Sequence, residues 1–179
     1  MPVIVLEMED HLKHKDILLS KIEQTKKASL SDDRQEISST DWNIPVEDKL
    51  YLDYFHPIML SKIEFLENNL EKFIGTFNGN PAGYKEMDYS YWFQQYRRND
   101  RHDWHYHLEA LWSCIYYLEL HEDNPPTMFR DFISYTGFIP EVKEGSLIIF
   151  PGTLEHCSAP NESDKRKTVI VCNIAPSPL

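Results

Sequence analysis

Cysteine, positive charge and long apolar runs are all scarce in this sequence of 179 residues. Its three cysteines are an odd number in a chain long enough to fold without disulfide bonds, which favours a reducing compartment. No apolar run approaches the length of a membrane span, and the N-terminal PVIVLE is too short for the apolar part of a signal peptide. These features predict a soluble, cytoplasmic protein with no membrane partner.

Acidic residues outnumber basic ones. The chain has 29 Asp and Glu residues and 18 Lys and Arg residues, so its net charge is -11. A groove for a phosphate backbone needs concentrated positive charge, so nucleic acid is not an expected partner. The 41% hydrophobic and 13% aromatic content is that of an ordinary globular protein. We expect one domain over residues 1–179, present as a monomer or homodimer.

Residues 1–87 are predicted to be mainly helical. The expected elements, in order, are a strand at 3–7, a helix at 10–27, a polar loop at 29–45, a helix at about 56–73 and a loop at 75–86. We interpret this half of the chain as a helical support for the second half.

Residues 88–175 are predicted to be a run of short strands. The candidates are DYSYWFQQY, LWSCIYYLEL, TMFRDFI, GSLIIFP and RKTVIVCNI, separated by turns rich in Pro, Gly and Asn. Strands that follow one another without helices between them favour antiparallel sheets packed as a sandwich or barrel. The fold class is therefore mainly β with N-terminal helices.

Three histidines, His102, His105 and His107, lie close together in a polar segment before one of these strands. In extended backbone, residues i and i+2 point to the same side, so His105 and His107 can meet at one metal ion. His156, just after the turn that follows GSLIIFP, offers a third ligand. Two nearly sequential ligands and one distant ligand leave open positions on a metal, as catalysis requires. We expect the histidines at 11, 14, 56 and 121 to be on the surface.

These motifs resemble those of the Fe(II)- and 2-oxoglutarate-dependent oxygenases, in particular the prolyl-hydroxylase-like members. In that family a strand with a tyrosine, here Tyr96, precedes a His-x-Asp motif, here His105 to His107, and a Phe-Pro strand precedes the distal histidine, here His156. The resemblance covers about residues 88–175. It implies a double-stranded β-helix, also called a jelly roll or cupin-like barrel.

The resemblance also implies the residues that hold 2-oxoglutarate. Tyr117 matches the family's tyrosine on the next strand, and Arg166 lies where an arginine binds the far carboxylate of oxoglutarate. Thr168 shares the expected face of Arg166 and adds a hydroxyl, with Tyr96 nearby. Lys167 is expected to face the other way.

One position departs from the family pattern, because His107 stands where the family has a carboxylate. Three explanations remain open. His107 binds the iron and gives a three-histidine site; or Glu109 supplies the carboxylate, with His107 and Glu109 as the pair of a His-x-Glu variant; or His107 leaves the iron and water or another anion fills its position. We choose the first, which is similar to a group of small oxygenases, phage-borne members among them, that carry His-x-His.

Two other kinds of protein fit part of the pattern. Cupins use His-x-His with a later histidine and need no oxoglutarate, but Thr153 and Asn99 stand where their motifs have glycine. A jelly roll can also be a binding module without catalysis. The resemblance favours an enzyme that consumes 2-oxoglutarate and O2 and hydroxylates a protein side chain, prolyl first, or a small metabolite.

Overall fold

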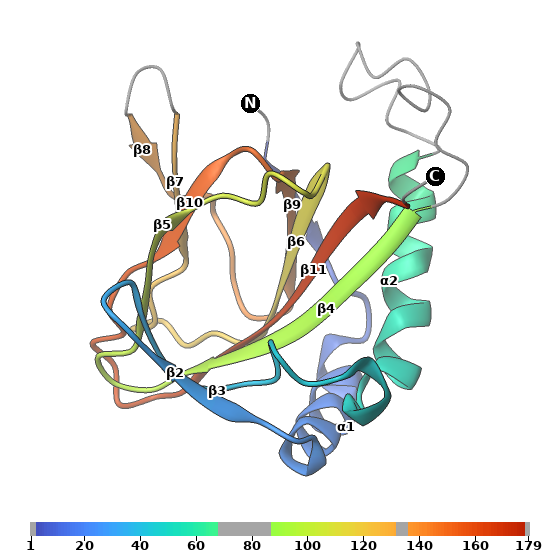
Figure 1. Cartoon of the computed structure of the whole chain (residues 1–179), viewed down its shortest axis with the longest axis horizontal. Coiled ribbons are helices and arrows are strands. Elements are labelled where there is room, and N and C mark those ends of the chain that lie inside the picture. The colour runs from blue at the N-terminus through green and yellow to red at the C-terminus, as the bar shows by residue number, and fades with distance from the viewer. Residues whose placement is uncertain (1–2, 68–86, 132–135, 178–179) are drawn as a thin grey trace.

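Eleven strands form one strongly curled sheet, with two helices packed against its outer face (Figure 1). The computed structural model describes residues 3–67, 87–131 and 136–177. The helical elements are α1 (His11–Gln24), the short 3-10 helix η1 (Val46–Asp48) and α2 (Leu52–Glu67). The strands are β1 (Ile4–Glu7), β2 (Ala28–Ser31), β3 (Gln35–Thr40), β4 (Met87–Tyr96), β5 (Arg101–His105), β6 (Trp112–Glu119), β7 (Thr127–Arg130), β8 (Gly137–Phe138), β9 (Ser146–Pro151), β10 (Glu155–Ser158) and β11 (Lys167–Pro176).

The strand order divides the sheet into two parts that β3 joins. Neighbouring strands follow the order β1-β9-β6-β11-β4-β3-β5-β10-β7-β8, and β2 pairs with β3. Residues 39–40 of β3 pair with β4, and residues 35–36 pair with β5. We call β1, β9, β6, β11 and β4 the major sheet, and β5, β10, β7 and β8 the minor sheet. The space between them is the interior of the barrel.

The major sheet is buried on both faces, which explains why its strands read as nearly continuous apolar runs. Along β11, residues 167–174 are all buried. Val169 and Val171 face the barrel interior, whereas Ile170 and Cys172 face the helices. This alternation follows from the two-residue period of a strand.

Helices α1 and α2 lie on the outer face of the major sheet (Figure 1). Three histidines that we expected on the surface instead tie this helical layer to tyrosines. His11 is hydrogen-bonded to Tyr116 at 2.6 Å, and His56 is hydrogen-bonded to Tyr91 at 2.7 Å. Within the layer, His14 is hydrogen-bonded to the Tyr54 hydroxyl at 2.8 Å.

The structure confirms most of the expected elements and corrects the polar loop. The expected strand at 3–7, the two helices and the five later strands correspond to β1, α1, α2, β4, β6, β7, β9 and β11. Most of the segment 29–45 is not a loop, because β2 and β3 occupy 28–31 and 35–40. The expected loop at 75–86 and the end of the second helix lie outside the described residues. No helix in the described part of the chain is long and apolar enough to span a membrane.

Candidate metal centre

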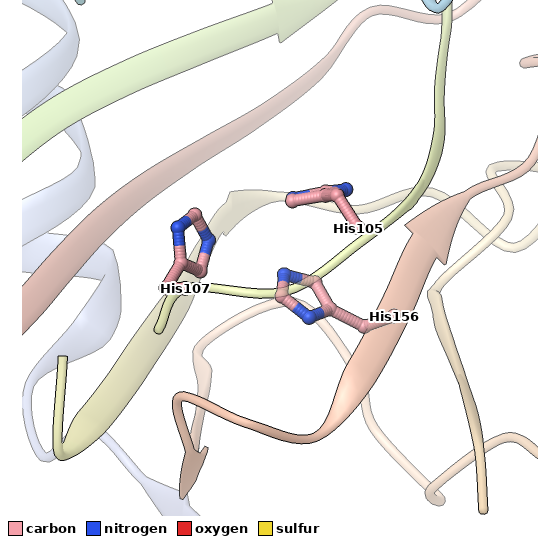
Figure 2. Close-up of side chains that lie close together, drawn as sticks. All are labelled: His105, His107 and His156. Atoms are coloured by element: carbon pink, nitrogen blue, oxygen red, sulfur yellow. The ribbon is translucent and has the colours of Figure 1, made fainter. Parts of the chain in front are cut away.

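His105, His107 and His156 converge at one point inside the barrel. Each offers one ring nitrogen, and these three atoms all lie within 4.8 Å of one another. Figure 2 shows the three rings turned toward a common centre, two from neighbouring strands and one from the turn that follows β5. The structure therefore brings together all three residues that we predicted as metal ligands.

Strand pairing places two of the three rings. His105 is the last residue of β5 and is the pairing partner of His156 on β10. Residues opposite each other in an antiparallel pair carry their side chains on the same face, and the two ring centroids are 4.2 Å apart. His105 and His156 are far apart in the sequence, and this one strand pairing brings their side chains together.

The turn at Gly152 places the third ring. The backbone N–H of His107 donates to the Gly152 carbonyl at 2.7 Å, and the Gly152 N–H donates to the Leu111 carbonyl at 3.1 Å. A Cβ at position 152 would lie 2.2 Å from the Ala110 carbonyl oxygen and 2.5 Å from that of His107. Only glycine permits this approach, so the Pro-Gly turn after β9 positions the His107 loop.

Hydrogen bonds fix the orientation of two of the three rings. His105 Nδ1 donates to the Asp103 carbonyl at 2.7 Å, and His156 Nδ1 donates to the Leu154 carbonyl at 3.0 Å. In these two rings the bond from Nδ1 fixes the tautomer whose Nε2 carries the lone pair, which is the arrangement of metal-binding imidazoles. His107 Nδ1 lies 3.7 Å from the Glu109 carboxylate, beyond hydrogen-bond distance.

Burial keeps these imidazoles neutral. Desolvation lowers the pKa of His107 to about 4 and holds the pKa of His156 well below its ordinary value. The pKa of His105 is lowered for the same reason. A metal ligand must be the neutral ring, so these side chains need lose no proton near pH 7 before an ion binds. The donor set of three imidazoles fits a first-row transition metal and leaves coordination positions open.

Two other polar residues, Glu109 and His102, lie near this centre but outside the group of three histidines. Glu109 is not part of the three-residue group, and its side chain is 70% exposed. His102 stacks on His105 with the ring centroids 3.8 Å apart and is not part of the group either. Of the three explanations for the missing carboxylate, the geometry supports the first, with His107 as a ligand.

A cavity of about 370 Å³ opens beside the three histidines, and among the described residues that line it Lys167 is the one lysine or arginine. Lys167 is 1% exposed, and its Nζ donates to Ser158 Oγ at 2.5 Å and to the Pro125 carbonyl at 2.9 Å. Nζ also lies 4.4 Å from the centre of the Tyr96 ring. Burial lowers the pKa of Lys167 to about 7. No carboxylate pairs with this ammonium group among the residues that the structure describes.

The predicted orientation of Arg166 and Thr168 is wrong. Arg166 forms ion pairs with Glu119 and Glu23 and borders a separate polar surface depression. Thr168 donates to the same Glu119 carboxylate. Side chains alternate along a strand, so an error of one residue exchanges the two faces, and Lys167 is the residue that faces inward.

The two predicted tyrosines take different places. Tyr96 lines the cavity, and its hydroxyl donates to Gln94 Oε1 at 2.8 Å. Tyr117 is fully buried behind the wall; its hydroxyl donates to Thr127 Oγ1 at 2.8 Å and accepts from the Thr127 N–H at 3.0 Å. Thr127, which the sequence analysis did not single out, is the residue of this pair that lines the cavity.

No family model matches the chain, and no curated protein is similar to it in sequence. Solved structures are similar in fold over nearly the whole chain. A prolyl-4-hydroxylase from Pseudomonas putida superimposes with a TM-score of 0.68 at 11% identity, covering 98% of this chain and 93% of its own. The chain has the fold of the 2-oxoglutarate and Fe(II) oxygenases.

Two further structures extend that likeness. A viral collagen prolyl hydroxylase from Paramecium bursaria Chlorella virus 1, solved with 2-oxoglutarate, has a TM-score of 0.60 at 17% identity, with 96% of this chain and 94% of that chain covered. The α-ketoglutarate-dependent epimerase of nogalamycin biosynthesis has a TM-score of 0.69 at 8% identity, with 96% and 76% covered. The expected double-stranded β-helix is therefore confirmed.

Proposed function

We propose that this chain is an Fe(II)- and 2-oxoglutarate-dependent oxygenase that hydroxylates a protein side chain, prolyl first, with a small metabolite as the other possible substrate. The observation that carries the proposal is that buried Lys167, which has no carboxylate partner among the described residues, lies in the same cavity as three convergent imidazoles. Oxoglutarate has a keto acid end that chelates a metal and a second carboxylate that needs a cation. The two halves of the cavity match its two ends.

Fe(II) would be held by His105, His107 and His156. Imidazole nitrogen is a suitable ligand for iron, and three protein ligands leave room for oxoglutarate and O2. Because all three ligands are neutral, the protein gives the metal no negative charge. The doubly negative oxoglutarate then supplies all of the charge that balances the ion, so oxoglutarate and metal should bind cooperatively.

Lys167 would hold the far carboxylate of oxoglutarate, in place of Arg166. Ser158 and Thr127 border the cavity and can donate hydroxyl hydrogen bonds to the same group. Burying a carboxylate is costly unless a charged donor pairs with it, and burying Lys167 without an anion is costly for the same reason. Binding of oxoglutarate removes both costs together.

The chemistry that iron and oxoglutarate supply when bound is oxidative decarboxylation, which gives succinate and CO2 and places one oxygen atom of O2 in a substrate C–H bond. The chain's own contribution is to orient the bound groups and to exclude water from the cavity. Val169 and Val171 line the cavity along β11, with Ile115 beside them. These apolar side chains keep the reacting centre dry. The cysteines Cys114, Cys157 and Cys172 are buried free thiols, which supports a cytoplasmic location.

The first test is anaerobic titration of the metal-free protein with Fe(II) and then oxoglutarate, followed by the visible charge-transfer band of the chelate. We expect the band with the unmodified chain. Lys167→Met should raise the oxoglutarate concentration needed for the band by about 100-fold or more, because it leaves a buried carboxylate unpaired. The matched control, Arg166→Met, should change it by less than about threefold, since that side chain is outside the cavity.

The other outcomes decide between the alternatives. Equal effects of the two substitutions would place the anchor elsewhere. Iron binding without a band would favour a cupin-type metalloenzyme that needs no oxoglutarate. Failure to bind iron would leave a binding module with no catalysis.

A further inference from the structure

Three inward-facing side chains of β4 line the cavity between the metal centre and Lys167. They are Trp92, Gln94 and Tyr96, spaced two residues apart, and alternation along the strand puts them on one face. Tyr96 is the pairing partner of Lys167, and the ring centroid of Trp92 lies 5.9 Å from that of His107. A ligand that reaches from the metal to Lys167 therefore passes Gln94.

Gln94 is a buried side chain with one half of its carboxamide group engaged. It is 6% exposed, and its Oε1 accepts a hydrogen bond from the Tyr96 hydroxyl at 2.8 Å. Its Nε2 forms no hydrogen bond with the residues that the structure describes, and it is not one of their fully enclosed polar atoms. Gln94 therefore presents an unused donor to the cavity that it lines. Such a donor requires an acceptor, which a bound ligand can supply.

The Tyr96 hydroxyl fixes the orientation of this carboxamide. The oxygen and the nitrogen of an amide point in different directions, so a donor on Oε1 leaves the NH2 group on the side away from Tyr96. Tyr96 is itself 2% exposed, and the centre of its ring lies 4.4 Å from Lys167 Nζ. Tyr96 therefore lies at the Lys167 end of the cavity, and the free donor of Gln94 points away from that end.

Strand register gives the position of Gln94 relative to Lys167. Gln94 pairs with Val169, two residues from Lys167 along β11, which is a displacement of about 6.6 Å. The displacement is toward Trp92 and so toward His107. When Lys167 holds one carboxylate of oxoglutarate, the rest of the molecule extends in this direction to the metal. Gln94 is therefore placed to meet the keto acid end rather than the far carboxylate.

The keto acid end needs a hydrogen-bond donor from outside the metal ligands. His105 and His156 use the Nδ1 hydrogen for backbone carbonyls, so neither ring has an N–H left for a bound ligand. A carboxylate that is buried without a donor costs free energy, whereas an N–H that donates to it forms a charge-assisted hydrogen bond. Binding of oxoglutarate would satisfy the Gln94 donor and the carboxylate together.

On the basis of the proposed function, we propose that Gln94 is a further oxoglutarate-binding residue, with Nε2 donating to the keto acid end beside the metal. Tyr96 is the positioning residue that holds the carboxamide in the donating orientation. The contact is a hydrogen bond between a neutral donor and an anion, with no transfer of a proton. Gln94 and Lys167 would thus recognise opposite ends of the same molecule.

The test uses two anions that share the chelating end. Oxalate has that end alone, whereas oxoglutarate also has the far carboxylate. Calorimetry of the Zn²⁺-loaded protein measures the Kd of each anion. Gln94→Met, which keeps the size of the side chain, should weaken binding of both anions by about tenfold or more. Lys167→Met should weaken binding of oxoglutarate far more than that of oxalate, because oxalate has no far carboxylate.

Two further variants separate the hydrogen bond from a change in packing. Gln95→Met is the matched control, since Gln95 borders the separate polar surface depression and donates to Thr168 Oγ1 at 3.5 Å. It should leave both affinities unchanged. Tyr96→Phe keeps the ring beside Lys167 and removes the orienting hydroxyl, so it should weaken oxalate binding by about three- to tenfold.

Nuclear magnetic resonance of the carboxamide group gives a direct readout. The chain has four glutamines, so the Zn²⁺-loaded protein labelled with ¹⁵N-glutamine gives few side-chain signals, each assigned by substitution. Adding oxalate should move one Gln94 Nε2 proton signal downfield to saturation and leave the Gln95 signals in place.

The outcomes distinguish this contact from the proposed function. An oxalate Kd that Gln94→Met does not change, with a stationary Gln94 signal, would refute the contact. A loss confined to oxoglutarate would place Gln94 at the far carboxylate and overturn the assignment. If the unmodified protein binds oxalate through Gln94 and does not bind oxoglutarate, the proposed function fails and Gln94 remains a donor to a chelating anion. Failure to bind either anion would refute both.

Discussion

At the scale of single residues, the candidate site depends on which atoms of each side chain are already engaged. His105 and His156 use Nδ1 for backbone carbonyls two residues earlier in the chain, so the opposite nitrogen points into the barrel. Lys167 uses its ammonium group for one carbonyl and one hydroxyl. These neutral acceptors hold the charge in place without neutralising it, and this leaves the ammonium available to an anionic ligand.

The choice between His107 and Glu109 as the third ligand can be decided by metal affinity. His107→Ala should weaken Fe(II) or Zn²⁺ binding by about 100-fold or more, since it removes one of three donors. Glu109→Gln should change the affinity by less than about tenfold, because that carboxylate touches only the outer nitrogen of His107. The affinity is read by competition with a chromophoric chelator. The opposite ranking of the two variants would make Glu109 the ligand.

The oxoglutarate affinity should depend on pH through Lys167. Its pKa is lowered to about 7 in the free protein, and a bound carboxylate raises the pKa again. Above pH 7, binding therefore takes up a proton, and the affinity should fall by up to tenfold per pH unit until the pKa of the complex is reached. Below pH 7 the lysine is already charged in the free protein, so it contributes no further change in the oxoglutarate affinity.

Calorimetry of oxoglutarate binding at pH 7, 8 and 9, with metal present, measures this slope. Lys167→Arg is the matched control, because the guanidinium stays protonated throughout and the slope should vanish. A slope that survives this substitution would assign the pH dependence to another group.

At the scale of elements, a close turn and two short strands determine whether the three histidines meet. The pairing of β5 with β10 positions the rings of His105 and His156, and the turn after β9 positions the ring of His107. These elements are short and belong to the minor sheet or its connections, whereas the long strands of the major sheet provide the wall of the cavity. The metal site therefore depends on local contacts more than on the core.

Gly152→Ala should disrupt the site while the major sheet remains folded. The added Cβ would overlap the carbonyls of Ala110 and His107, so the His107 loop must move away from the other two rings. We expect metal affinity to fall by about 100-fold, with the far-ultraviolet circular dichroism spectrum unchanged. Gly137→Ala is the control, since the nearest atom to its Cβ is 3.6 Å away. Retention of full metal affinity by Gly152→Ala would show that the turn does not hold His107.

The sequence was sufficient to predict the long elements and the three histidines that converge inside the barrel. Strands of the major sheet are apolar on both faces, and His-x-His with a later histidine is a recognisable pattern. Strands β2, β3, β5 and β10 are short and partly polar, so their composition resembles that of loops.

The orientation of Arg166 was mispredicted because the sequence does not fix on which residue the alternation of β11 begins. Three basic residues, Lys165, Arg166 and Lys167, are consecutive, and alternation places Arg166 on the opposite face from Lys165 and Lys167. In the structure Lys167 lines the cavity, whereas Arg166 forms an ion pair with Glu119 outside the barrel.

At the scale of the whole molecule, the metal would connect residues from the two sides of the barrel. His105 and His156 belong to the minor sheet, whereas the His107 loop is attached to the ends of β6 and β9 in the major sheet. Among the described strands β3 pairs with both sheets, and the sheets also share a core that includes Phe129 and Phe150; an ion at the three histidines would add a further link between them.

Metal binding should therefore raise the melting temperature. At a free ion concentration of 100 times Kd, mass action stabilises the folded state by about 2.7 kcal/mol. For a chain of this size that corresponds to roughly 5–11 °C. Differential scanning calorimetry with Zn²⁺ and after chelation measures the shift, and His156→Ala should abolish it. A shift of the same size in His156→Ala would mean that the ion binds elsewhere.

The position of β11 has a consequence for biosynthesis. This strand follows all the others in the sequence, yet it lies between β4 and β6 and pairs with both along most of its length. On the ribosome, β4 and β6 are made first and must wait with unpaired edges until residues 167–176 emerge. A nascent chain in that state exposes two long apolar strands, which are prone to associate with other chains. This exposure lasts from the synthesis of β6 until that of β11.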